Sequence, residues 1–191
     1  MMRGMDIDIC PYQEVLREKF MTTNEWTKLN DRYQSILFPE MIKNFNITDE
    51  KLTLLTAYPY VDNYYSAWFD QMEITNELDD EAKDGIEQIL RDGLYEGFYG
   101  FDLAIRLATS RFFNFLRTTL QWKVDAIEGV ENTPKFYNDI KYMYLSAHDS
   151  SLTAFMSGFQ QKQKVQAYFA SNIVVMLKVS EYIVISSVGN N

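Results

Sequence analysis

The chain is poor in cysteine and histidine. Its 191 residues include one cysteine, Cys10, and one histidine, His148. A single cysteine cannot form a disulfide within the chain or supply a zinc site built from several thiolates. A single histidine excludes any mechanism that needs two imidazoles from this chain. Because the cysteine count excludes only these structures, it leaves the redox compartment open.

Basic residues are also scarce. The chain has 18 Lys and Arg residues against 27 Asp and Glu residues, which gives a formal net charge of −9. Proteins that bind nucleic acids neutralise phosphates with clustered Lys and Arg side chains, and no basic stripe with interleaved aromatic residues occurs here. The composition therefore argues against a nucleic-acid partner.

Long apolar runs are absent as well. The longest, such as "NIVVMLKV", is far shorter than the roughly 20 residues that a membrane-spanning helix needs. The N-terminal sequence lacks the basic region, apolar stretch and small-residue cleavage site of a secretory signal. We therefore expect no membrane span, and the localisation stays unknown.

The chain nevertheless contains enough apolar material for a core. Hydrophobic residues make up 47% of it and aromatic residues 15%, which suits one domain, or a core with a cap, at this length. Helical spacing and capping signals predict helices over most of the first two thirds. They cover residues 11–20, a segment from a capping box at Thr22 and Glu25 into the mid-forties with Pro39 as its end or kink, residues 46–72 with a break at Pro59, the segment 76–100 as far as a closing turn, and residues 101–122.

Two of these segments have a distinct character. Residues 76–100 are strongly acidic, so we expect a solvated helix followed by a turn that contains glycine. Residues 125–139, with Gly129 and Pro134, are expected to form a loop.

The pattern changes at residue 140. "IKYMYLSA" is aromatic and β-branched with little charge, which is typical of a buried strand, and "SSLTAFMSGF" is typical of a helix that stops near Gly158. Residues 167–179 and 181–188 predict two further strands around a polar turn at Ser180 and Glu181. So few strands cannot form a stable buried sheet alone, which indicates part of a larger α/β fold.

His148 and Asp149 lie where the predicted strand ends and the next helix begins. Ligands of open α/β sheets bind at the carboxyl ends of strands, and a helix N-terminus attracts anions, so phosphate is the ligand that this junction suggests. A protonated imidazole would add a charge and a donor, and the carboxylic acid could protonate a leaving alkoxide. A purely structural interpretation is also open, with Asp149 or Ser150 as N-cap and His148 as an ordinary partly buried histidine.

Three segments resemble the histidine acid phosphatases, a branch of the histidine phosphatase superfamily that includes the phytases. "YLSAHDSSLTAFMSGF" resembles the C-terminal signature of that family through Ser146, Ala147, His148, Asp149 and Ser150. "YFASNIVVMLKV" resembles the strand that follows it, and "CPYQEVL" resembles the Cys-Pro segment that opens the helical cap region. Together these segments span nearly the whole chain.

The resemblance implies a fold, a reaction and two roles. It implies a partial histidine-phosphatase-like α/β fold, with a mostly helical cap region over residues 1–100. Residues 101–191 would form the C-terminal part of the core, a strand-helix-strand-strand unit of a mainly parallel sheet. Family members hydrolyse phosphomonoesters through a phosphohistidine intermediate, without a metal or organic cofactor. His148 would bind the phosphate and Asp149 would protonate the leaving group.

The sequence departs from the family at the nucleophile. That residue is the histidine of an Arg-His-Gly-x-Arg-x-Pro motif, and this chain has no such motif and no histidine besides His148. We therefore expect a fragment, a truncated gene product or a diverged copy that is inactive alone and whose N-terminal half or oligomeric partner is missing.

Two other functions stay open. One is a non-catalytic pseudoenzyme that binds a phosphorylated ligand. The other is a helical interaction module whose terminal strands complete another chain's sheet, with an aromatic face around Tyr64, Tyr65, Trp68 and Phe69.

Overall fold

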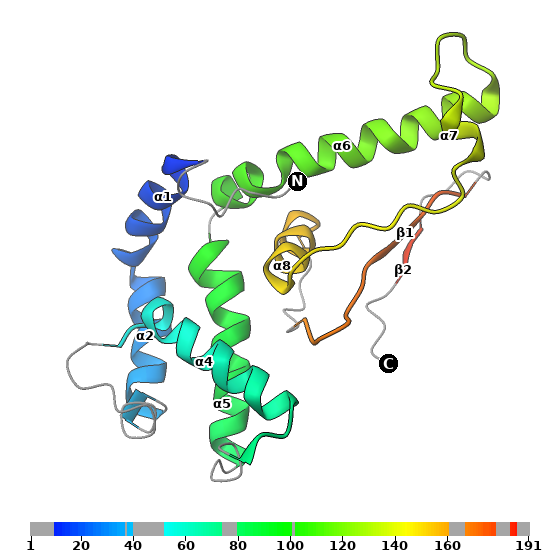
Figure 1. Cartoon of the computed structure of the whole chain (residues 1–191). Helices are drawn as coiled ribbons and strands as arrows, with labels where there is room; N and C mark the ends of the chain where they lie inside the picture. Colours follow the sequence, from blue (N-terminus) through cyan, green and yellow to red (C-terminus); the bar gives the residue numbers. More distant parts are fainter. Residues whose placement is uncertain are drawn as a thin grey trace.

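The computed structural model is mostly helical, with helices that gather around one core and a long helix that runs outward from it (Figure 1). It describes residues 10–36, 38–39, 52–73, 80–100, 102–160, 167–178 and 184–186. The expected end of the second helix in the mid-forties and the turn at Ser180 and Glu181 lie outside these residues.

The first two helices are α1, Pro11–Met21, and α2, Asn24–Ile36. Pro11 occupies the first turn of α1, where a missing backbone N–H costs nothing. The predicted cap of α2 is wrong by one residue. The hydroxyl of Thr23 accepts the N–H of Trp26 at 3.2 Å, whereas the Thr22 hydroxyl donates to the carbonyl of Lys19 at the end of α1.

Helix α4, Leu54–Phe69, continues through Pro59, so the predicted break is wrong. It begins with a capping box in which Thr53 and Thr56 each satisfy the other's backbone N–H. Pro59 lies on the exposed surface of the helix, while Leu54, Ala57 and Val61 are fully buried. The burial of this face stabilises the helix despite the hydrogen bond that Pro59 cannot donate.

The acidic segment forms α5, Asp80–Asp92, which runs directly into a π-helix, η2, Gly93–Phe98. The helix is confirmed, and the turn expected after it lies at Tyr99 and Gly100. The segment is not only a solvated surface, because Ile86, Ile89 and Leu90 are buried in the main core. The acidic residues mark one face of α5, and the other face packs on α4.

The main core is formed by α1, α2, α4 and α5. Its buried members include Trp26, Tyr33, Leu54, Val61 and Leu90. It also contains one polar pair, because the Tyr33 hydroxyl donates to the buried carboxylate of Asp92 at 2.5 Å. The Arg91 side chain donates to the other Asp92 oxygen at 3.0 Å, so both oxygens of this carboxylate are hydrogen-bonded.

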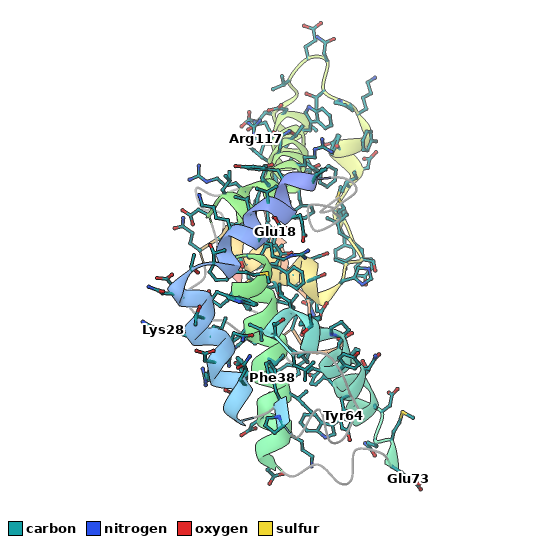
Figure 2. All side chains as sticks on the ribbon, turned by 90° about the vertical axis from the view of Figure 1, so that its left-hand side faces the viewer. Glu18, Lys28, Phe38, Tyr64, Glu73 and Arg117 are labelled. Atoms are coloured by element: carbon teal, nitrogen blue, oxygen red, sulfur yellow. The ribbon has the colours of Figure 1, made fainter. Side chains whose placement is uncertain are left out.

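A second cluster joins η2 to α6, Asp102–Glu128, and α8, Asp149–Gly158. Tyr99, Ala108 and Ala154 form its buried centre. The helices predicted at 101–122 and ending near Gly158 are confirmed, but α6 also includes residues expected in the loop. A short helix α7, Phe136–Asp139, follows. Figure 2 shows Arg117 of α6 well away from Phe38 and Tyr64 of the main core.

The only strands in the described residues are β1, Val174–Met176, and β2, Val184–Ser186. They fall within the two strands expected last in the chain and pair antiparallel, with Val175 opposite Ile185. The prediction of an α/β fold with a mainly parallel core sheet is therefore wrong: the chain is mostly helical, with one short antiparallel pair.

Residues 140–147, expected as a buried strand, form an extended segment that pairs with no other strand in the described part of the chain. It connects α7 to α8 (Figure 1), and every side chain from Lys141 to His148 is exposed. The residue pattern gives this segment a high propensity for β-structure. A strand forms only when a neighbouring strand pairs with it, and the described residues contain no such neighbour.

Candidate functional site

His148 and Asp149 lie at the start of α8. His148 is the N-cap, with extended backbone at φ −95° and ψ 167°, and Asp149 is the first helical residue. The backbone carbonyl of His148 accepts the N–H groups of Ser151 and Leu152, both at 3.0 Å. The predicted position at the beginning of a helix is thus confirmed, although an unpaired extended segment leads into it in place of a buried strand.

The structural interpretation of the two residues fails in its details. Neither Asp149 nor Ser150 is the N-cap, and the His148 side chain makes no capping hydrogen bond. That side chain is exposed, where an ordinary partly buried histidine was the alternative. A ligand in solvent can therefore reach the imidazole.

Asp149 is half-buried and partly satisfied by its own helix. Its Oδ1 atom accepts the N–H of Ser150 at 2.6 Å. With Ser151 and Leu152 bonded to His148, the N–H of Asp149 is the one first-turn donor with no hydrogen bond in the described part of the chain. The helix N-terminus thus offers a ligand one backbone donor, beside an exposed imidazole.

The charge of Asp149 acts on two other elements. Partial burial, and then the charge of Asp149, raise the pKa of Asp62 on α4 above its usual value. Burial and the same charge also raise the pKa of the Tyr58 and Tyr99 hydroxyls, so both stay protonated as donors. The structure therefore brings the carboxylates of Asp62 and Asp149 into one electrostatic neighbourhood with two phenols.

Glycines in η2 allow α4 to come this close. A Cβ at Gly93 would lie 2.8 Å from the ring of Tyr58, and one at Gly97 would lie 2.8 Å from Leu55. A larger residue at either position would force the side chain of Tyr58 or Leu55 to move. At the end of η2 the Tyr99 hydroxyl donates to the carbonyl of Ser150 at 3.3 Å, which ties α8 to the same unit. Single π-turns within helices occur often at functional sites, and this one positions the surroundings of Asp149.

Sequence reasoning identified His148 and Asp149 but missed Tyr58, Asp62 and Tyr99. A signal existed for two of them, because Tyr58 and Asp62 are four residues apart on one helix and so share a face. Tyr99 gave no signal, because only the fold brings it to Ser150.

The site brings together an imidazole, a backbone N–H and a carboxyl group, and His148 is the one histidine of the sequence. Among the described residues, no group of three or more His, Cys, Asp or Glu side chains could hold a metal ion. Within the same residues, no helix combines the length and apolarity needed to cross a membrane.

Comparisons of the chain with protein-family profiles, with curated proteins and with solved structures found no match.

Proposed function

We propose that the chain binds phosphate monoesters at the N-terminus of α8, as the phosphate-binding and proton-donating part of a histidine acid phosphatase-like site. His148 contacts the phosphoryl group and Asp149 faces the leaving oxygen. Alone, the chain binds the ester without hydrolysing it, because the reaction of that family needs a second imidazole and the sequence has only His148.

The arrangement of the Ser146–Asp149 sequence carries the proposal. The exposed imidazole of His148 and the Asp149 N–H meet at one helix N-terminus, and the half-buried Asp149 carboxylate lies beside them. A phosphate group needs donors and positive charge, and a leaving alkoxide needs an acid on its far side. These are the groups that the site presents.

The two neighbouring carboxylates make the proposed phosphate binding depend on pH. Ionised Asp62 and Asp149 repel a phosphate dianion, and a protonated imidazole attracts it. The raised pKa of Asp62 lets this carboxyl take up a proton at a higher pH than an ordinary aspartate does, which removes one nearby negative charge. The binding of phosphate should therefore be stronger at acidic than at neutral pH.

Thermal unfolding with and without phosphate tests the proposal. At about pH 5, millimolar phenyl phosphate or inorganic phosphate should raise the Tm of the wild-type chain, because a ligand that binds only the folded state stabilises it. His148→Ala should abolish the shift. Lys135→Ala, which removes an exposed cation at the start of α7, is the matched control and should retain it.

Two results would contradict the proposal. An equal Tm shift in His148→Ala and wild type would place phosphate elsewhere on the molecule. Hydrolysis of an aryl phosphate by the purified chain, lost in both His148→Ala and Asp149→Asn, would show that the site needs no second histidine.

A further inference from the structure

Positive charge is concentrated on one helix of this acidic protein. Residues 103–124 of α6 include four of the chain's 18 basic residues and none of its 27 acidic residues. In the sequence these four are five or six positions apart and form no continuous stripe. The helix brings three of them, Arg106, Arg111 and Arg117, to its exposed side. The charge of this surface is therefore opposite in sign to the net charge of −9.

The three arginines form no ion pair with a carboxylate in the described part of the chain. Arg117 donates to the side-chain oxygen of Asn114, one turn earlier, at 3.3 Å. The fourth basic residue, Lys123, is used within the fold, because it donates to the backbone carbonyls of Tyr137 and Asn138 at 3.0 and 2.8 Å. The arginines are thus available to an anionic partner.

Apolar side chains share the exposed side of α6 with the arginines. Leu103 and Phe115 are both 43% exposed, and Trp122 is 40% exposed. Phe115 follows Arg111 by four positions and Trp122 follows Phe115 by seven, so these three lie on one face of the helix. The Trp122 ring contacts Tyr137 of α7, with 5.2 Å between the ring centroids. Helices that lie in a membrane interface combine basic side chains with exposed aromatic and aliphatic ones in this way.

The opposite side of α6 is fixed in the fold. Ala108 and Thr109 are buried, and the Phe113 ring stacks on Phe155 of α8 with 5.3 Å between the centroids. The arginine side is therefore held outward, along a helix that runs away from the core (Figure 1). From residue 103 to residue 124 it is about 33 Å long. A long convex surface of this kind suits a flat partner, whereas a small ligand needs a concave pocket.

We propose that the exposed side of α6, from Leu103 to Trp122, binds a lipid bilayer that contains acidic phospholipids. The helix lies along the bilayer surface and does not cross it. The arginines contact lipid phosphates, and Leu103, Phe115 and Trp122 enter the region between the head groups and the acyl chains. This inference does not rest on the proposed phosphate site at α8.

Two physical arguments favour a bilayer as the partner. A nucleic acid also offers phosphates, but it has no apolar layer that could bury an aliphatic side chain such as Leu103. Each cation close to an acidic bilayer strengthens binding about fivefold. Salt screens the carboxylates that lie more than about 8 Å from the bilayer, so the acidic remainder of the chain opposes binding only weakly.

Co-sedimentation of the full chain with vesicles tests the proposal. The chain should bind phosphatidylcholine vesicles that contain about 30% phosphatidylserine and should not bind vesicles of phosphatidylcholine alone. The double variant Arg106→Gln/Arg117→Gln should bind the acidic vesicles about twenty-fivefold more weakly. Lys19→Gln/Lys28→Gln is the matched control, because it removes two exposed cations from α1 and α2 and should bind as wild type does. Figure 2 shows Lys28 well away from Arg117.

Tryptophan fluorescence tests the insertion of α6 independently of the arginine variants. With acidic vesicles the emission of wild type should shift to shorter wavelength, because Trp122 enters a less polar medium. Trp122→Phe should lose the shift and still bind. Trp68→Phe, which removes a half-buried tryptophan of α4, should retain it.

Four results would overturn the proposal. They are equal binding to neutral and acidic vesicles, binding that Arg106→Gln/Arg117→Gln leaves unchanged, and binding of a single-stranded oligonucleotide without binding of vesicles. The fourth is a loss of vesicle binding in His148→Ala, which would place the lipid head group at the start of α8. If His148→Ala abolishes the effect of phosphate and leaves vesicle binding intact, the two sites are separate.

Discussion

Asp62 and Asp149 are carboxylates on different helices, and the charge of Asp149 acts on Asp62. The pKa of Asp62 is raised first by partial burial and then by Asp149. The folded state therefore holds the Asp62 proton more tightly than the unfolded state does. This favours the folded state below the unfolded pKa of about 3.9, and the contribution is lost as the pH rises through the folded pKa.

We predict that Asp149→Asn lowers the pKa of Asp62 toward 3.8, because it removes a nearby negative charge. Asp62→Asn should raise the Tm at neutral pH, and the gain should vanish below about pH 4, where the wild-type carboxyl is also neutral. Carboxyl NMR titration and thermal unfolding against pH check the two parts. Asp70→Asn is the control, because Asp70 is an exposed carboxylate at the C-terminal end of α4. If Asp149→Asn left the titration of Asp62 unchanged, the two carboxylates would not interact, and the prediction would be wrong.

The candidate site was predictable from the sequence only in part, and the reason lies in these residues. Ser146–Asp149 is a contiguous sequence, so its position at a helix start can be inferred locally. Asp62 reaches Asp149 through the packing of α4 on η2, and Tyr99 reaches Ser150 through the packing of η2 on α8. Such juxtapositions depend on the tertiary fold, which no local pattern of one sequence specifies.

At the scale of elements, Gly158 fixes how closely α8 packs on α6. A Cβ at this position would lie 2.4 Å from the Phe113 ring. That ring cannot move freely, because it stacks on Phe155 at 5.3 Å and meets the edge of Phe159 at 5.0 Å. Since α8 carries His148 and Asp149, the fit at Gly158 also holds the candidate site in place.

Gly158→Ala should therefore destabilise the protein by about 1–3 kcal/mol, as overpacked cores do. Helix propensity alone predicts the opposite sign, a gain of about 1 kcal/mol, so chemical denaturation discriminates between the two effects. Ser157→Ala, at the neighbouring position, is the matched control. The Ser157 hydroxyl is buried without a hydrogen-bond partner in the described part of the chain, and its removal should be neutral or stabilising. If Gly158→Ala were as stable as wild type, α8 could shift relative to α6 without a loss of stability.

The helices were predictable because their apolar residues repeat at helical spacing, as in α6. The errors concern local conformation that tertiary contacts decide. Pro59 stays helical because the opposite face of α4 is buried, although residue type alone favoured a break there.

At the scale of the whole molecule, the chain divides its burial unevenly. The large apolar side chains with the least exposure, Leu54, Val61, Ile89, Leu90 and Leu94, belong to α4, α5 and η2. The expected parallel sheet does not form, because residues 140–147, despite their apolar pattern, have no partner strand in the described part of the chain. Strand formation depends on such partners, whereas a helix satisfies its own backbone.

This unevenness predicts a graded pattern of amide hydrogen exchange. Opening free energies within one protein range from about zero in unpaired segments to the global value, which is about 5–15 kcal/mol for a typical domain. The amides of residues 141–147 should exchange at nearly the rate of an unfolded peptide, because they have no backbone partner in the described part of the chain. Those of Ile89 and Leu90 should be the slowest, because both side chains are fully buried.

Slow exchange at residues 141–147 would contradict this gradient, because it would mean that the segment has a hydrogen-bonding partner within its own chain. Fast exchange there together with slow exchange at Ile89 and Leu90 would show that opening of the segment is independent of unfolding of the core.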